Sequence, residues 1–170
     1  MDNTIIIVVV VLTLTTLACP STGADTWMTD YDQHFTFQCD ENQHLKSIDS
    51  AHDNAKEDRV FNFTCEDAPA WTLLGGCEWS GFANDYDGFL EYQCPKESVI
   101  TGIESIHSNP KEDRIFKFKC CEPFGGPPGM FTHGCLYTDF VNDYDETFSF
   151  AVPDGMVLRG VSSIHDNSKE

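Results

Sequence analysis

The sequence predicts an all-β fold that is built from three copies of one unit and stapled by disulfides. Three segments align without gaps, DYDQHFTFQC (30–39), DYDGFLEYQC (85–94) and DYDETFSFAV (143–152). Within each copy aromatic and polar residues alternate, as in half-buried strands. Cysteines also recur at matching positions of the first two copies. Threefold repetition of short strands predicts pseudo-threefold symmetry, which suits a β-prism or a β-trefoil, and the pattern leaves both open.

The three copies span residues 30–65, 85–121 and 143–170, with equivalent positions 55 and then 58 residues apart. The third copy stops within GVSSIHDNSKE, where the first two continue into "DR" and an aromatic strand. We therefore expect the third repeat to be truncated at Glu170. The complete protein should continue with an Asp-Arg, aromatic-alternating strand.

Short strands account for the pattern within each copy. In RVFNFTC (59–65), Arg59, Phe61, Phe63 and Cys65 share one face. From Val99 onward isoleucines are spaced by three, and the segment is too short for a helix, so we expect a strand with a bulge at Gly102. A fourth strand from each linker would give about twelve strands in total.

The N-terminal residues 1–24 predict a secretory signal peptide. An apolar and threonine-containing run, 5–18, is followed by small residues at Thr22 and Ala24. About 14 apolar residues fall short of the ~20 that a spanning helix needs. We expect secretion to the extracellular matrix or extracellular fluid, one domain over 25–170, and no transmembrane segment after signal removal.

The charge of the chain restricts its partners. Asp and Glu number 28 against 10 Lys and Arg, which gives a formal net charge of −18. Such a surface repels phosphate and sulfate polymers, so nucleic acid, heparin-like glycans and anionic membranes are poor partners. Cations, basic collagen-like surfaces and neutral sugars remain as candidate partners.

The repeat predicts the disulfide pairing of six of the eight cysteines. Cys39 and Cys65 of the first copy correspond to Cys94 and Cys120 of the second, which leaves Cys77 to pair with Cys121. No Cys-x-x-Cys spacing suggests zinc, and a secreted chain favours disulfides. Cys135 corresponds to Cys77, and we expect its partner to lie beyond Glu170.

The repeated unit resembles the dermatopontin family, and most closely its invertebrate branch of hemagglutinin and amebocyte aggregation factors. The second copy carries SIH (105–107), EDR (112–114) and FKFKCC (116–121), and the first carries EDR (57–59) with FNFTC (61–65). NDYDG (84–88) is similar to the opening of that branch's repeat. The resemblance implies a secreted, disulfide-bonded adhesive protein acting in matrix assembly, cell adhesion or lectin-like agglutination. A cnidarian cytotoxin is similar too. The family's usual Trp after "DR-x" is Phe here, and the acidic charge argues against binding of sulfated glycosaminoglycan.

Seven recurring polar residues are candidates for ligand binding: Asp58, Arg59, Asp113, Arg114, His52, His107 and His165. The aspartates could accept hydrogen bonds from sugar hydroxyls beside an arginine and an aromatic face. Alternatively each arginine is a structural strut bonded to carboxylates, which the shared face of Arg59, Phe61 and Phe63 favours. A histidine that recurs in every copy also indicates a role in the fold, because a catalytic site needs different residues in one place.

Two further features give weaker evidence of a functional site. The paired aspartates of each DYD segment could bind Ca²⁺, although turn formation explains them better; they are Asp30, Asp32, Asp85, Asp87, Asp143 and Asp145. No other metal or cofactor is expected. Asn62 in NFT is an N-glycosylation sequon.

No catalytic residue is expected, because the chain has neither a nucleophile elbow nor a phosphate loop and its cysteines are assigned to bridges. We predict a secreted, non-enzymatic, lectin-like adhesive protein that binds cell-surface glycans or matrix proteins, with multivalency from three similar faces or a homo-oligomer. One alternative is an acidic structural component of an extracellular matrix, including a mineralised one. The other is a cytolytic toxin.

Overall fold

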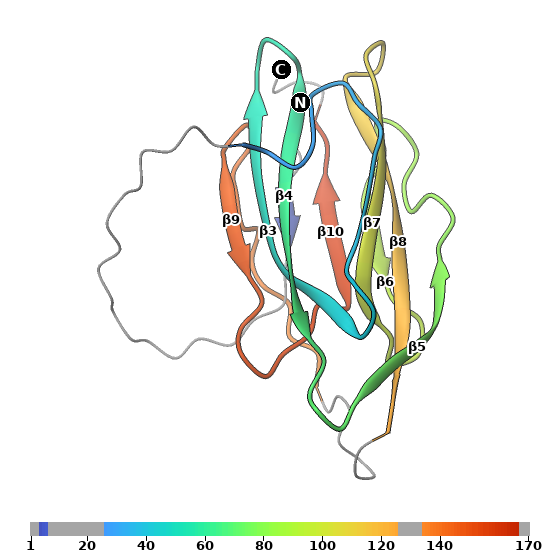
Figure 1. The fold of residues 1–170 in the computed structure, drawn as a ribbon. Coiled ribbons are helices and arrows are strands. Elements are labelled where there is room, and N and C mark those ends of the chain that lie inside the picture. The colour runs from blue at the N-terminus through green and yellow to red at the C-terminus, as the bar shows by residue number, and fades with distance from the viewer. Residues whose placement is uncertain (1–3, 7–25, 126–133, 167–170) are drawn as a thin grey trace, which may run out of the picture.

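The computed structural model describes residues 4–6, 26–125 and 134–166, and within these ranges the chain forms ten strands and no helix (Figure 1). The prediction of an all-β fold is therefore confirmed for this part of the chain. The strands are β1 (Thr4–Ile6), β2 (Phe35–Gln38), β3 (Gln43–Asp53), β4 (Asp58–Asp67), β5 (Leu73–Trp79), β6 (Leu90–Gln93), β7 (Val99–Ser108), β8 (Asp113–Phe124), β9 (Phe148–Ala151) and β10 (Gly160–Ile164).

Three antiparallel sheets are present, in the orders β2-β7-β8-β5, β4-β3-β9 and β1-β10-β6. In each copy the DYD segment leads into a short opening strand, and that strand pairs with a long strand of the next copy. Thus β2 pairs with β7, β6 with β10, and β9 with β3 (Figure 1). Backbone hydrogen bonds therefore join the copies to one another, so no copy has a complete sheet of its own.

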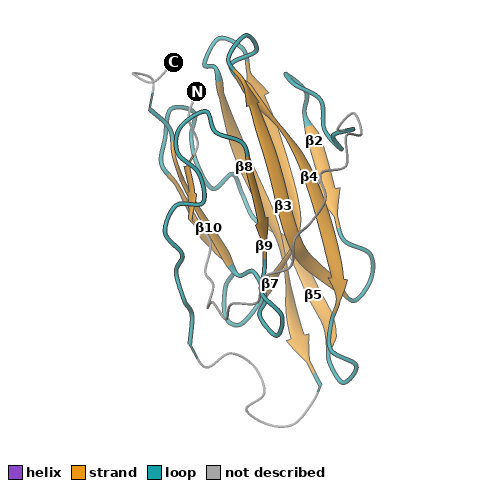
Figure 2. Ribbon diagram, turned by 90° about the vertical axis from the view of Figure 1, so that its left-hand side faces the viewer, coloured by secondary structure: helices purple, strands orange, loops and turns teal. Residues whose placement is uncertain are grey.

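The long strands form hairpins that run along the length of the molecule (Figure 2). The β7–β8 register shifts between Ile100 and Gly102, which confirms the predicted bulge. A Cβ atom at Gly102 would lie 2.9 Å from the carbonyl oxygen of Phe37, and one at Gly160 would lie 2.7 Å from that of Tyr92. Close approach of the opening strand thus requires glycine at these two equivalent positions.

The core lies where the inward faces of the three sheets meet. Phenylalanines at alternate positions of the strands are buried there, namely Phe61, Phe63, Phe116, Phe118, Phe148 and Phe150. Phe37 stacks on Phe63 with ring centroids 4.7 Å apart, and Tyr92 stacks on Phe118 at 4.9 Å. Side chains alternate between the two faces of a strand, so the aromatic alternation in the sequence becomes this core.

Three disulfides staple the sheets, and they are the pairs expected from the repeat alignment: Cys39–Cys65, Cys94–Cys120 and Cys77–Cys121. The first two are equivalent and tie an opening strand to a hairpin. Cys77–Cys121 holds the linker strand β5 against β8. Among the described cysteines, Cys135 alone has no disulfide partner, and it is exposed.

Other predictions concern the N-terminal segment and the two linkers. Most of the predicted signal peptide lies outside the described residues, and its residues 4–6 form β1, which pairs with β10. The first linker supplies a strand, β5, as expected. Part of the second linker, 126–133, lies outside the description, and 134–147 contains only an isolated bridge at Phe140. Within the described ranges no helix is long and apolar enough to cross a membrane.

Candidate functional site

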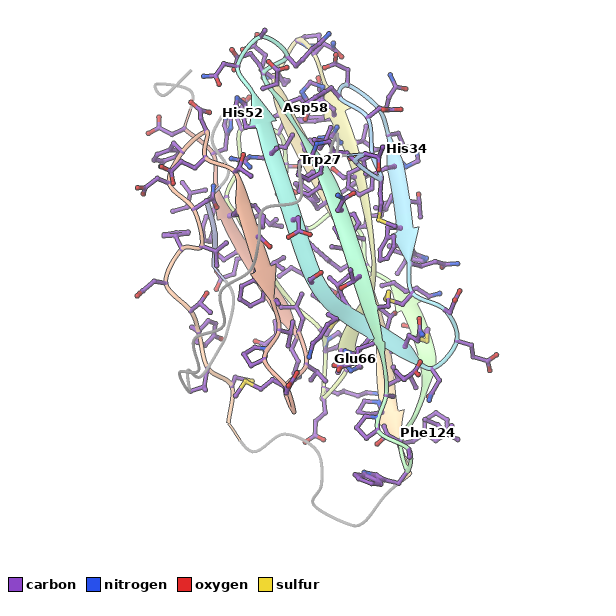
Figure 3. The ribbon with its side chains drawn as sticks, turned by 60° about the vertical axis from the view of Figure 1, so that its left-hand side comes forward. Trp27, His34, His52, Asp58, Glu66 and Phe124 are labelled. Atoms are coloured by element: carbon purple, nitrogen blue, oxygen red, sulfur yellow. A yellow bond between two sulfur atoms is a disulfide. The ribbon has the colours of Figure 1, made fainter. Side chains whose placement is uncertain are left out.

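The structure brings the seven recurring polar candidates together at one end of the strands, where Figure 3 labels His52 and Asp58. Five of them line one small cavity: His52, Asp58, Arg59, Asp113 and Arg114. His107 lies 3.9 Å from Asp58, and His165 lies 3.9 Å from Asp113. We call this set of seven residues the polar end.

Little space is available for a ligand at the polar end. The cavity has a volume of about 20 Å³, whereas pockets that enclose small molecules hold about 300–1,000 Å³. The four Asp and Arg side chains are nearly inaccessible, with at most 4% exposure. The geometry therefore favours the structural-strut interpretation over direct sugar contact.

Arg114 joins the second copy to the first. Its Nε donates to Oδ1 of Asp58 at 2.5 Å and its Nη2 donates to Oδ2 at 2.7 Å, which forms a bidentate pair. Its Nη1 donates to the carbonyl of Gln33 at 3.1 Å, and its guanidinium lies 5.5 Å from the ring centre of Phe35. A fully buried, bidentate arginine with aromatic support is a rigid strut between copies.

Arg59 joins the first copy to the third in a corresponding way. Its Nη2 donates to the carbonyl of Glu146 at 2.9 Å, and its guanidinium lies 5.9 Å from the ring centre of Phe148. Glu146 and Phe148 are the equivalents of Gln33 and Phe35 in the alignment. Each arginine thus contacts the turn and opening strand of the copy that precedes its own in the cycle of strand pairings.

The three histidines lie at the same boundaries, each facing acidic groups of another copy. Nδ1 of His107 is 3.4 Å from Oδ1 of Asp32, and Nε2 of His52 is 3.2 Å from Oδ1 of Asp145. Nε2 of His165 is 3.7 Å from Oδ1 of Asp87. Their side chains are at most 2% exposed. Burial lowers the pKa of His52, because an imidazolium loses hydration there, while Asp145 and Glu57 oppose this shift.

The DYD aspartates form turns that the polar end holds in place. Asp32, Asp87 and Asp145 adopt left-handed backbone conformations, with φ of 60°, 60° and 58°, which Asp tolerates better than most residues. The backbone N–H of Asp32 donates to Asp58 and that of Asp87 donates to Asp113. Burial raises the pKa of Asp113, although the backbone N–H groups of Arg114 and Asp87 and the charge of His165 favour its ionised form. Asp30, Asp85 and Asp143 are exposed.

The sequence interpretation missed a cluster of exposed apolar side chains at the far edge of the β5–β8 pair. Trp71 is 55% exposed, Leu73 54% and Phe124 49%. Leu73 and Phe124 are cross-strand partners, and the Phe124 ring lies directly over Gly75. We call these three residues the aromatic edge. Its signal is present in the linker APAWTLLGG, from which the sequence predicts a strand but not the exposure of the apolar side chains.

Asn62 of the sequon lies on β4, on the side away from buried Phe61 and Phe63. Its Oδ1 accepts a hydrogen bond from the backbone N–H of Met28 at 2.7 Å. Glycosylation would modify the amide nitrogen and leave this oxygen in place. Modification of Asn62 remains a prediction.

The polar end and the interleaved strands define a disulfide-stapled, all-β protein whose repeated units are fastened together by buried arginines and histidines. Comparison with known families identifies the family to which this chain belongs. The dermatopontin family model matches residues 29–170, and the chain belongs to the dermatopontin family. The resemblance found in the SIH and EDR motifs is thereby confirmed.

Three relatives illustrate the range of the family. The chain is 34% identical over 171 residues to a hemagglutinin/amebocyte aggregation factor from Limulus polyphemus, covering 100% of this chain and 92% of that protein. It is 40% identical over 140 residues to Millepora cytotoxin-1 from Millepora dichotoma, covering 82% of this chain and 60% of that one. It is 36% identical over 134 residues to dermatopontin from Biomphalaria glabrata, covering 79% and 86%. No solved structure matches the chain.

Proposed function

We propose that this protein is a secreted, non-enzymatic adhesive protein that binds neutral glycans or matrix proteins and promotes cell adhesion or agglutination. The observation that carries the proposal is the similarity to a hemagglutinin/amebocyte aggregation factor along the whole chain. The charge of −18 supports neutral or basic partners over sulfated or phosphorylated ones.

The aromatic edge is the surface that we propose for the partner. Exposed apolar clusters on soluble proteins mark interaction sites, and aromatic side chains supply much contact area with few rotatable bonds. Leu73 and Phe124 stand on an antiparallel pair that Cys77–Cys121 holds together, and Trp71 lies in the turn that leads into β5. Their backbone positions are therefore set before a partner arrives. The seven residues of the polar end then maintain the scaffold and do not contact the ligand.

The arrangement of the copies also supports a multivalent mode of action. Each opening strand pairs with the next copy and the third returns to the first, a cyclic pattern that fits three repeats about a pseudo-threefold axis, as in a β-prism or β-trefoil. Similar faces about one axis, or a homo-oligomer, would cross-link cells even if each contact is weak.

A second candidate is a cytolytic protein, favoured by the 40% identity to Millepora cytotoxin-1. Lysis and adhesion make different demands on the aromatic edge. A lytic protein would insert these side chains into a lipid surface, whereas an adhesive one would hold a glycan or protein against them.

Hemagglutination with sugar competition separates these candidates. We expect the purified full chain to clump erythrocytes without releasing haemoglobin, and a panel of neutral mono- and disaccharides or soluble collagen to inhibit clumping. Haemoglobin release at the same protein concentrations would support the cytolytic candidate. A chain that neither clumps nor lyses cells, and that binds neither matrix protein nor glycan, would refute the proposal.

A further inference from the structure

We propose that Asp32, Asp58 and His107 form a zinc site at the boundary between the first and second copies. One donor atom from each side chain lies within 4.8 Å of the other two. Asp32 and Asp58 come from the first copy and His107 comes from β7 of the second. A bound ion would therefore join the two copies at the point where Arg114 already fastens them.

The histidine provides the evidence that sets this site apart from a surface acidic cluster. The His107 side chain is 2% exposed, and neither of its ring nitrogens has a hydrogen-bond partner. Oδ1 of Asp32 is also buried without a hydrogen-bond partner. Buried polar atoms normally have such partners. An ion bound to Nδ1 of His107 and Oδ1 of Asp32 would supply two of these three missing interactions. Nε2 would then carry the ring proton, 3.9 Å from Oδ1 of Asp58.

The donor geometry is close to that of a tetrahedral ion. With bonds of about 2.1 Å, two ligands of a tetrahedral zinc ion lie roughly 3.4 Å apart. Nδ1 of His107 lies 3.4 Å from Oδ1 of Asp32. The third donor, a carboxylate oxygen of Asp58, lies within 4.8 Å of the other two, so this carboxylate must move closer for one ion to bind all three side chains.

Asp58 retains a free lone pair for the ion despite its pairing with Arg114. Oδ2 accepts from Nη2 of Arg114 and from the backbone N–H of Asp32, each at 2.7 Å, which uses both of its lone pairs. Oδ1 accepts one bond, from Nε of Arg114. Its second lone pair remains, and Arg114 orients the carboxylate as outer-shell partners of metal ligands commonly do.

One imidazole and two carboxylates favour zinc over calcium, because calcium prefers a shell made entirely of oxygen. Three protein ligands leave a fourth position for water. The side chain of Asp32 is 27% exposed, which gives an entry route from solvent.

The boundary between the second and third copies is a natural comparison, with Asp87, Asp113 and His165 in equivalent positions. There the His165 nitrogens lie 3.7 and 3.9 Å from the carboxylates. Each boundary has a cation beside one carboxylate, Lys111 on Asp87 and Arg114 on Asp58. Among the described residues, however, three donor atoms lie within 4.8 Å of one another only at the first boundary. We therefore expect zinc to select the first boundary.

Calorimetric titration of EDTA-treated full chain with ZnCl₂ tests this site. The background carries Cys135→Ser, because an exposed thiol is itself a zinc ligand. We expect one zinc ion per chain, a higher Tm with zinc because the ion binds the folded state, and no competition from Ca²⁺. Co²⁺ in place of zinc should give the visible absorption of a four-coordinate site.

Asp32→Asn is the test variant and Asp87→Asn is its matched control. Both positions have φ of 60°, which Asn tolerates, so neither turn should be disrupted. Asp32→Asn should weaken zinc binding at least tenfold and abolish the Tm shift, whereas Asp87→Asn should leave both unchanged. Absence of one-to-one binding, or equal loss in the two variants, would overturn the proposal. This outcome is independent of agglutination, which the titration does not involve.

Discussion

The polar end and the aromatic edge occupy opposite ends of the molecule, where Figure 3 labels Asp58 and Phe124. Asp58 and Arg114 are each 3% exposed, whereas Trp71 is 55% exposed. The polar end consists of residues that recur in the repeat, and each contacts another copy. The aromatic edge comes from a linker and the end of one strand. In this protein recurrence marks what assembles the fold, and the non-recurring surface is available for a partner.

The largest effect is expected from loss of the strut at the polar end. Arg114→Ala leaves Asp58 buried without its cation, and removing one partner of a buried pair costs about 3–5 kcal/mol. Urea denaturation should show this loss in the free energy of unfolding.

A double variant keeps this test interpretable if Arg114→Ala does not fold. Asp58→Asn combined with Arg114→Met removes both charges and should recover most of the stability. Lys111→Ala, which removes an exposed ion pair with Asp87, should be indistinguishable from the parent protein. A loss as large in Lys111→Ala as in Arg114→Ala would contradict the contrast between buried and exposed charges.

The next effect concerns the staple beneath the aromatic edge. Replacement of Cys77 and Cys121 by Ala opens a bridge between residues 44 positions apart. Loss of a native disulfide from a small secreted domain typically costs about 2–5 kcal/mol. We also expect weaker agglutination, because β5 would be free to separate from β8.

The comparison between stability and agglutination makes that test specific. Replacing Cys39 and Cys65 by Ala removes a bridge between residues 26 positions apart, and neither cysteine lies on β5 or β8. That variant should lose stability but, while folded, should agglutinate as the parent does. Equal loss of agglutination in the two variants would argue against a role for β5.

The aromatic edge itself should affect function more than stability. Trp71→Ala with Phe124→Ala removes side chains that are about half exposed, so each should cost well under the about 3–5 kcal/mol of a buried aromatic. The agglutination titre should fall at least about tenfold, because aromatic anchors dominate binding energy at interfaces. Phe89→Ala, at another aromatic that is 53% exposed, serves as the control. A normal titre in the double variant would exclude this edge as the adhesive surface.

The contrast between the two ends also explains what could be predicted from the sequence. Strand alternation, the bulge at Gly102 and the disulfide pairing depend on local periodicity and on comparison between copies, both of which are visible in one chain. The partnership of Arg114 with Asp58 depends on which copy lies next to which. The sequence does not reveal that β2 pairs with β7 of the following copy, so it cannot predict that Arg114 of one EDR motif contacts Asp58 of the other.

The aromatic edge was missed for a different physical reason. Exposure of Trp71 and Leu73 depends on the strand β5 lying at the margin of its sheet. The sequence of an apolar linker is the same whether its side chains enter the core or face solvent. Gly75 beneath the Phe124 ring is the local feature that could have indicated a flat, ring-covered strand pair.

The smallest effect is expected from titration of the buried histidines. Burial lowers the pKa of His44, which is 3% exposed, and likewise that of His52. As the pH drops through about 6.5, the unfolded chain binds these protons more readily than the folded chain does. The free energy of unfolding should therefore fall as the pH drops from 7.5 through 6.5 to 5.5. Asp113 contributes in the opposite sense, because its raised pKa makes the folded chain take up a proton before the unfolded chain does.

Replacement of His44 by Gln isolates the histidine contribution from that of Asp113. Urea midpoints at pH 7.5, 6.5 and 5.5 should decline less steeply in the variant than in the parent, because Gln carries no titrating proton. Equal slopes in the variant and the parent would show that burial does not lower the pKa of His44. A shallower slope would mean that the scaffold weakens with acidity through buried side chains such as His44, which are not part of the aromatic edge. Acid sensitivity of agglutination should then follow the fraction of folded protein and not the chemistry of the adhesive surface.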